Sequence, residues 1–269
     1  MSHFDPDEFV NYDEEFQMAE AKASVPVPAV KESTAVVSWQ EELAKMAVAT
    51  AEAEKPSGNW VSFKGGRLTI GGNPMKDDKV QCVVVNSVFE NMWYKSKYDP
   101  DNPQSPSCYA IAEQEDDLKP HKDAEAPQAA TCAECPKNAW GSDPSGGRGK
   151  ACKNVRRLAM IASTDLQAVP KAEVAVAKLP VTSVGNWSSY ANQIASVLKL
   201  PPLAVITEMS VVPSNKTIFQ VEFSLVDKIT DGAVIQELLG KRKDTMDLMY
   251  AGYEKNNTAE RPAEAARKF

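Results

Sequence analysis

The sequence predicts an α+β fold, in which a small β-barrel carries helices on its flanks and a long insertion between two of its strands. Three observations predict this class. Runs of β-branched residues such as KVQCVVVNSVFE (79–90) are typical of buried strands, whereas the apolar residues of 183–199 recur at helical spacing. A polar stretch over residues 113–154 contains three of the five cysteines and separates two predicted strands, so it is expected to be an insertion.

The N-terminal part of the chain is predicted to be an arm followed by a helix. Residues 1–33 are expected to form a flexible acidic arm, because the first twenty residues carry seven carboxylates and no Lys or Arg. The next segment, 34–55, is expected to be helical, since Ser38 and Glu41 have the spacing of a capping box. The sequence KPSGN then ends the helix.

Residues 56–230 are expected to form the β core. The stretch WVSFKGGRLTI predicts a hairpin that turns at Gly65 and Gly66. After the central strand at 79–90, a Pro- and Asn-rich loop leads to the next strand. Further strands are expected at 108–112, 155–163 and 172–181, and as a hairpin around PSNK within 203–226.

Two helices complete the predicted fold. Residues 183–199 form the first, which Pro201 and Pro202 end. Residues 231–255 form a C-terminal helix, followed by a tail at 256–269. A helix before the last two of about five core strands is typical of the oligonucleotide-binding barrel, the OB-fold. The sequence therefore predicts an OB-fold-like β-barrel with a cysteine-rich, zinc-binding insertion at 113–154.

Composition limits the partners and the compartment. The net charge of −7 over 269 residues excludes a uniformly basic nucleic-acid binder, so attraction for phosphate must be local. No apolar run is long enough to cross a membrane, and the acidic N-terminus lacks the features of a signal peptide, so we expect a cytoplasmic protein. Cysteines in a reducing compartment favour metal ligands over disulfides. Cys82, inside the central strand, is expected to be an inert core residue.

A metal site is predicted from the spacing of four cysteines. Cys132 and Cys135 form a Cys-x-x-Cys turn, and Cys152 follows within the loop range of structural zinc sites. The fourth ligand is expected to be Cys108, with His121 as the alternative. Zn²⁺ is the expected metal, and an iron–sulfur cluster is the alternative, because both accept four thiolates. The competing interpretation is a set of unconnected free thiols.

A basic and aromatic surface is predicted around the insertion. From residue 137 to 157 the chain carries six Lys or Arg and one acid, without a complete Gly-x-x-x-x-Gly-Lys-Ser/Thr phosphate-binding motif. Cations that follow the phosphates and rings that stack on bases hold single-stranded nucleic acid. The expected phosphate contacts are Lys95, Lys97, Arg148, Lys150, Lys153, Arg156 and Arg157, and the expected stacking rings are Trp93, Tyr94, Tyr98 and Trp140.

Structural interpretations compete for some of these residues. Trp93 and Tyr94 follow a predicted strand, and aromatic rings at strand ends also close a barrel core. Adjacent strand residues point to opposite faces of a sheet. At most one of Arg156 and Arg157 is therefore expected to line a given groove.

Several segments resemble proteins encoded in tailed-phage genomes near replication genes. They are NWVSFKGGRLTIGG, YDPDNPQSPSCYA, CAECPKNAWGSDPSGGRGKACKNVRRLAMI and NWSSYANQIASVLKLPPLAVITEMSVVP, within residues 59–213. The predicted architecture is also similar to the zinc-containing single-stranded DNA-binding proteins of phages, which hold a metal-bound subdomain against an OB-fold. This chain departs from that family in its N-terminal acidic stretch and in a ligand set richer in cysteine.

The resemblance implies a non-catalytic protein that coats single-stranded DNA during phage replication or recombination, in the cytoplasm of the host. Its expected partners are single-stranded DNA, replication or recombination proteins, and a second protomer joined through the N-terminal arm. One alternative is a zinc-ribbon adaptor that binds a polymerase or another protein. A second is a metal-dependent nuclease, which is disfavoured because acids such as Glu90, Asp99 and Asp101 are scattered.

Overall fold

The structure, a computed structural model, describes residues 39, 41–43, 45–46, 60–96 and 104–253. The chain divides into two compact units, residues 1–55 and 56–269. In the first unit the described residues are helical, in agreement with the helix expected over 34–55. The acidic arm at 1–33 and the tail at 256–269 lie outside the described residues. The second unit contains the sheet and the candidate site.

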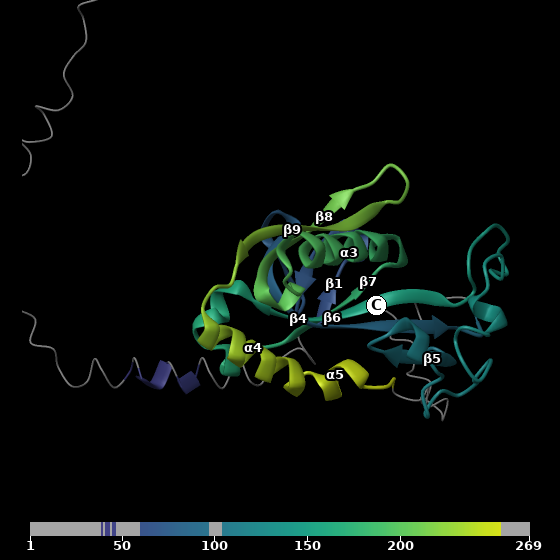
Figure 1. The fold of residues 1–269 in the computed structure, drawn as a ribbon, viewed down its shortest axis with the longest axis horizontal. Coiled ribbons are helices and arrows are strands. Elements are labelled where there is room, and N and C mark those ends of the chain that lie inside the picture. Colours follow the sequence, from purple (N-terminus) through teal and green to yellow (C-terminus); the bar gives the residue numbers. More distant parts are fainter. Residues whose placement is uncertain (1–38, 40, 44, 47–59, 97–103, 254–269) are drawn as a thin grey trace, which may run out of the picture. The chain divides into compact units, whose positions relative to one another are not determined.

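One curled sheet of nine strands forms the second unit in the described chain (Figure 1). Its order is β3-β2-β1-β7-β6-β4-β8-β9, and β5 pairs with β4 outside this path. β1 and β7 are parallel, and the other pairs are antiparallel. The strands are β1 (Trp60–Ser62), β2 (Thr69–Ile70), β3 (Asn73–Pro74), β4 (Lys79–Trp93), β5 (Cys108–Ala112), β6 (Lys153–Ala162), β7 (Ala175–Leu179), β8 (Val205–Pro213) and β9 (Phe219–Lys228).

β4 is the strand around which the sheet is organised. It pairs with β8 near its start, with β6 along most of its length and with β5 at its end. Both of its faces are buried, because Cys82 and Val84 face one core while Val83 and Val85 face the other. The prediction of an inert Cys82 agrees with this position: the residue is 1% exposed, and burial raises the pKa of its thiol to about 12.

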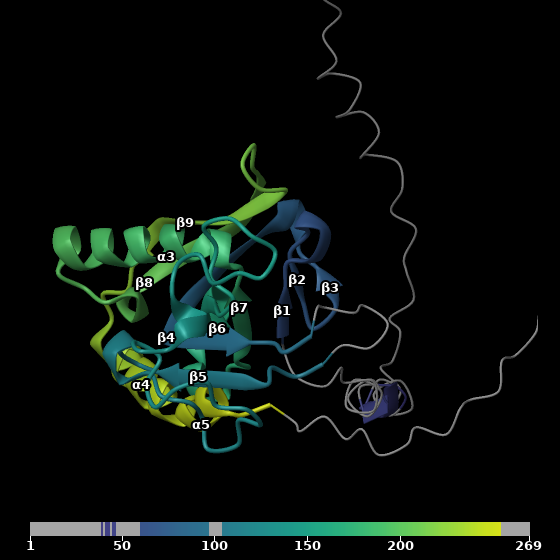
Figure 2. The ribbon, with the colours of Figure 1, turned by 90° about the vertical axis from the view of Figure 1, so that its right-hand side faces the viewer.

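Helices cover the two faces of the sheet (Figures 1 and 2). α3 (Val181–Gln193) lies along β8 and β9, with Trp187 packed in the larger core. Val61 of β1 and Val221 of β9 share this core although their strands stand far apart in the sheet order, so the sheet is curled into a half-barrel. α4 (Gly232–Asp244) and α5 (Met246–Tyr250) cover the opposite face.

Both predicted helices differ from expectation at their ends. α3 begins at Val181 and continues as a π-helical turn, Ile194–Leu198, which Lys199 ends with φ 57°. The single helix expected over 231–255 is wrong, because α4 and α5 are separated at Thr245 and α5 ends at Tyr250. The buried Thr245 hydroxyl donates to the carbonyl of Arg242 at 2.8 Å, and such local side-chain bonds compete with regular helix geometry.

The α+β class and the helix between β7 and β8 are confirmed. The described strands form a half-barrel whose order ends at β3 and β9, and a closer relation to the OB-fold stays a prediction. No helix in the described part of the chain combines the length and apolar character needed to cross a membrane.

Candidate metal centre and nucleic-acid interface

The register of three strands brings Cys108 and Cys152 to the same end of the sheet. Cys108 is the first residue of β5 and pairs with Trp93, the last residue of β4. Cys152 immediately precedes β6, whose first residue, Lys153, pairs with Met92. Because β5 and β6 both run antiparallel to β4, both strands start beside its C-terminal end.

Hydrogen bonds fold the Cys132-x-x-Cys135 turn back onto this end of the sheet. The amide of Cys132 donates to the carbonyl of Leu118 at 3.0 Å, and the amide of Cys152 donates to the carbonyl of Lys137 at 2.8 Å. The Asn138 side chain donates to the carbonyl of Cys132 at 2.9 Å. The insertion covers residues 113–152. It ends two residues earlier than the predicted 113–154, because β6 begins at Lys153.

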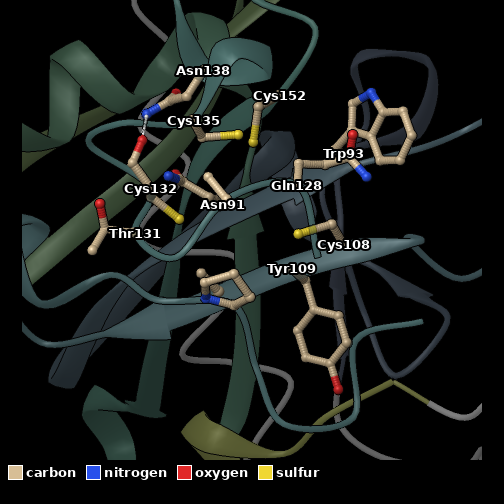
Figure 3. Close-up of a pocket in the computed structure, with 13 residues that line it drawn as sticks. Asn91, Trp93, Cys108, Tyr109, Gln128, Thr131, Cys132, Cys135, Asn138 and Cys152 are labelled. Carbon is tan, nitrogen blue, oxygen red and sulfur yellow. Dashed lines mark hydrogen bonds between the residues drawn. The ribbon is translucent and has the colours of Figure 1, made fainter. Parts of the chain in front are cut away.

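The four predicted cysteines line one cavity (Figure 3). Their sulfur atoms face the same space, which has about 10 Å³ of room for a water-sized sphere and so admits one small atom. The alternative ligand His121 does not line this cavity; its Nδ1 instead lies 2.8 Å from the hydroxyl of Tyr109. Cys108 is therefore better placed than His121 to act as the fourth ligand.

The thiols are reduced and buried to different degrees. All the cysteines of the described chain are free of disulfides. Burial, followed by the neighbouring Cys132 and Cys135, raises the pKa of Cys152 to about 12, and burial also raises the pKa values of Cys108 and Cys132. A bound cation would reverse this trend, because a coordinated thiol loses its proton.

The cysteines gather without reaching ligand geometry. Within the described residues, no group of three or more His, Cys, Asp or Glu side chains is arranged closely enough to hold a metal ion. Thiolate sulfurs lie about 2.3 Å from zinc in tetrahedral sites, so the four sulfurs would have to move closer together to bind one. The type of donor and the enclosure fit a thiolate-bound metal, while the present separation of the sulfurs does not.

The same insertion presents cations beside exposed rings. Trp140 is 78% exposed, and the ammonium of Lys150 lies 5.1 Å from its ring centroid. Arg148 lines a surface hollow together with Trp140 and two glycines, one of which, Gly147, has a φ of +86° that favours glycine. At the base of the insertion, the ammonium of Lys137 lies 5.4 Å from the centroid of Trp93.

The other residues predicted to contact nucleic acid differ in their exposure and in their pairing. Tyr94 and Lys95 are exposed just beyond β4, while Lys97 and Tyr98 lie outside the described residues. Lys153 is exposed but forms an ion pair of 3.1 Å with Asp143. Hydrogen bonds from Ser145, followed by that from Lys153, lower the pKa of Asp143 to about 2, so Asp143 stays charged and offsets one cation of the loop.

The two adjacent arginines of β6 point to opposite faces, as strand geometry requires. Arg157 corrects the prediction of a phosphate contact: it is 2% exposed, and its guanidinium is engaged inside the protein. Arg156 lies over the ring of Phe89, 3.1 Å from the centroid, and its buried Nε has no hydrogen-bond partner among the residues that the structure describes. Burial lowers the pKa of Arg156 to about 10.

A buried polar cluster was missed by sequence reasoning. Glu90, 0% exposed, forms an ion pair of 2.6 Å with Arg157 and one of 3.4 Å with Lys178, and it also accepts a hydrogen bond from Tyr253. Burial alone would raise the pKa of Glu90, but Lys178 and Arg157 together lower it. The available signal was the presence of charged residues inside three largely apolar strands: Glu90 in β4, the Arg156–Arg157 pair in β6 and Lys178 in β7.

Comparisons of the sequence with models of known protein families and with curated proteins, and of the fold with solved structures, find no match. The site must therefore be interpreted from its own geometry.

Proposed function

We propose that this protein binds single-stranded DNA without catalysis, and that its insertion is held by a structural metal. The observation that carries the proposal is the pairing of cations of the insertion with two tryptophan rings, one on the insertion and one at the end of β4. Trp140 is exposed, Lys150 lies over its ring and Arg148 lines the same surface hollow, while Lys137 lies over the ring of the half-buried Trp93. Stacking of a base on an exposed ring contributes about 1–3 kcal/mol with little sequence preference, and adjacent cations neutralise phosphates.

The metal part of the proposal rests on the four cysteines around one cavity. Cys108, Cys132, Cys135 and Cys152 would hold Zn²⁺, or an iron–sulfur cluster as the alternative. The bound group would be structural: it would tie the turn at Cys132 to the starts of β5 and β6, so that the loop bearing Trp140 is fixed beside the sheet. Replication or recombination proteins remain the expected further partners, in the host cytoplasm if a phage encodes the chain.

The half-barrel is compatible with the OB-fold-like architecture proposed from the sequence. OB-folds bind oligonucleotides on a curved sheet and its adjoining loops. The candidate interface lies on such a loop, at the end of β4 where Tyr94 and Lys95 are also exposed. This supports a strand path that crosses the insertion rather than the helical faces of the sheet.

A nuclease is less well supported by the arrangement of carboxylates. Glu90 is the one buried acid among the described residues, and its two oxygens are engaged by Arg157, Lys178 and Tyr253. Such an acid has no oxygen free to hold a catalytic metal. No observation specifically favours the adaptor function, so it serves as the outcome expected if DNA is not bound.

Fluorescence titration with a short oligo(dT) tests DNA binding. We expect salt-sensitive quenching of tryptophan emission and an affinity that Trp140→Ala lowers by roughly five-fold or more, equivalent to one lost stack of about 1–3 kcal/mol. Trp60→Ala is the matched control, because Trp60 is also exposed (46%) but lies on β1, separated from β5 by β7, β6 and β4.

If the wild-type protein shows no quenching at low salt, DNA binding is wrong and the adaptor alternative is favoured. Elemental analysis with an absorption spectrum tests the metal separately. One zinc per chain without visible absorbance supports the structural zinc, visible absorbance with iron supports the cluster, and neither metal leaves the cysteines as free thiols.

A further inference from the structure

We propose that the C-terminal strap, residues Met249–Tyr253, is a latch that orders the cysteine-rich insertion, so that strap docking and the order of the cysteine cavity strengthen each other. The strap begins with the last two residues of α5, Met249 and Tyr250, and packs against the face of the sheet that lies opposite the cavity. Glu90, which the strap contacts, and Asn91, which lines the cavity, are neighbours on β4 and point to opposite faces.

Arg157 holds the start of the strap. Its Nη1 donates to the carbonyls of Met249 and Ala251, each at 3.0 Å. These carbonyls lie at the end of α5, where backbone acceptors lack helical partners and a cation is favourable. The other nitrogens of Arg157 donate to Glu90, so one guanidinium fastens the strap to β4 and β6 together.

Tyr253 holds the end of the strap. Its hydroxyl donates to Glu90, and the ammonium of Lys178 lies 4.5 Å from its ring centroid. Its ring also meets that of Tyr109 edge-on, with centroids 4.9 Å apart. Both ends of the strap are therefore fastened to the buried cluster around Glu90.

Gly252 brings the strap into direct contact with the insertion. A Cβ at this position would lie 2.6 Å from the hydroxyl of Tyr109 and 3.3 Å from His121 Cε1, so no side chain fits here without displacement. Tyr109 and His121 are themselves joined: their rings stack at 4.8 Å, and the amide of His121 donates to the carbonyl of Tyr109 at 2.7 Å.

From Tyr109 and His121 the contacts lead to the cysteines. Tyr109 follows Cys108 directly in β5. His121 lies close in sequence to Leu118, whose carbonyl accepts the hydrogen bond from the amide of Cys132. The strap thus supports the two residues that anchor the first part of the insertion, behind two of the candidate ligands.

The consequence is reciprocal coupling. If the strap docks only when Tyr109 and His121 are in place, then whatever orders the insertion, including a metal, must favour the docked strap by the same factor. The part of this proposal that concerns metal rests on the proposed function, whereas the coupling between strap and insertion does not.

Hydrogen exchange measured by mass spectrometry on the full-length, metal-free protein tests the coupling. Gly252→Ala introduces the obstructing Cβ, and Gly240→Ala is the matched control, because a Cβ on Gly240 in α4 meets nothing within 4 Å. We expect Gly252→Ala to speed exchange at least five-fold over residues 118–135 as well as in the strap, and Gly240→Ala to change neither. Faster exchange confined to residues 249–253 would overturn the latch.

Two further measurements keep the test decisive. If Gly252→Ala fails to fold, Tyr253→Phe removes only the hydroxyl and is expected to give the same pattern with a smaller increase; an unchanged insertion would again overturn the proposal. Competition of Zn²⁺ between the protein and a coloured chelator should show at least five-fold weaker binding for Gly252→Ala than for Gly240→Ala, the lower end of typical coupling. Equal affinities contradict coupling to the metal site, whereas no uptake by the wild-type protein contradicts the metal and leaves the exchange result to decide the latch.

Discussion

Replacing Arg157 by alanine should destabilise this protein far more than replacing an arginine in a surface ion pair. Arg157 is 2% exposed and Glu90 is 0% exposed, and two hydrogen bonds of 3.2 and 2.6 Å join them. Removing one partner of a buried ion pair leaves an uncompensated charge and costs about 3–5 kcal/mol. Lys178, 3.4 Å from Glu90, would still offset part of this charge, but the carbonyls of Met249 and Ala251 lose their donor as well, so we expect a loss within this range.

The assay measures the free energy of unfolding in urea, monitored by circular dichroism, for Arg157→Ala and for a control variant, Arg67→Ala. Arg67→Ala is the matched control, because Arg67 lies 2.9 Å from Asp78 but its side chain is 64% exposed. Exposed pairs contribute about 0–1 kcal/mol, so Arg67→Ala should have little effect. A loss of 4 kcal/mol corresponds to a fall of roughly 10 °C in Tm for a domain of this size.

The reasoning is refuted if the free energies of unfolding of Arg157→Ala and Arg67→Ala agree within about 1 kcal/mol. A double variant, Glu90→Leu with Arg157→Leu, provides an internal check. Since it removes both charges and leaves apolar groups in their place, it should be more stable than Arg157→Ala alone. If it is less stable, the cost of Arg157→Ala comes from lost packing rather than from the unpaired carboxylate.

Three further predictions concern charge and the insertion. The folded pKa of Glu90 is lowered, so the stability that its carboxylate contributes is complete above its unfolded pKa of about 4.3 and is lost as the pH falls through the folded value. The free energy of unfolding in urea should therefore depend less on acid pH in Glu90→Gln than in the wild-type protein. Equal slopes of this free energy against pH would contradict the prediction. Lys150→Ala should reduce the slope of log affinity against log salt for oligo(dT) by about 0.7, the value of one phosphate contact, whereas Lys216→Ala in the β8–β9 hairpin should leave it unchanged; equal slopes for both variants would exclude Lys150 from the interface. Cys135→Ser should abolish zinc retention measured by elemental analysis, while a conservative change at the buried Cys82, Cys82→Ala, should preserve it; retention by Cys135→Ser would remove that residue from the ligand set.

Much of the sheet could be predicted from sequence, because its signals are local. The β-branched run beginning at Lys79 indicated a buried central strand, and the hairpins at Gly65 and around PSNK have turn residues between apolar stretches. The gathering of the cysteines was predicted from spacing alone. The choice of Cys108 over His121, in contrast, depends on strand register, since Cys108 meets the site only because β5 pairs with the end of β4.

The buried cluster could not be predicted in the same way. Arg157 was interpreted as a surface cation because it follows Arg156 in a basic segment, yet the alternation of the strand turns it toward α5. Its partners Glu90 and Tyr253 are separated from it by 67 and 96 positions in the numbering, and only the assembled sheet brings them together. The break between α4 and α5 at Thr245 was not predicted either, because the helical periodicity of the sequence continues past this residue.

The energetics of the insertion explain why it needs support from both faces of the sheet. Between residues 113 and 152 the buried side chains are Leu118, Cys132 and Cys152. Because so few side chains of this long segment are buried, hydrophobic burial contributes little to its order. The cysteine cavity on one face and the strap on the other supply the two places where additional binding free energy can hold the loop that carries Trp140.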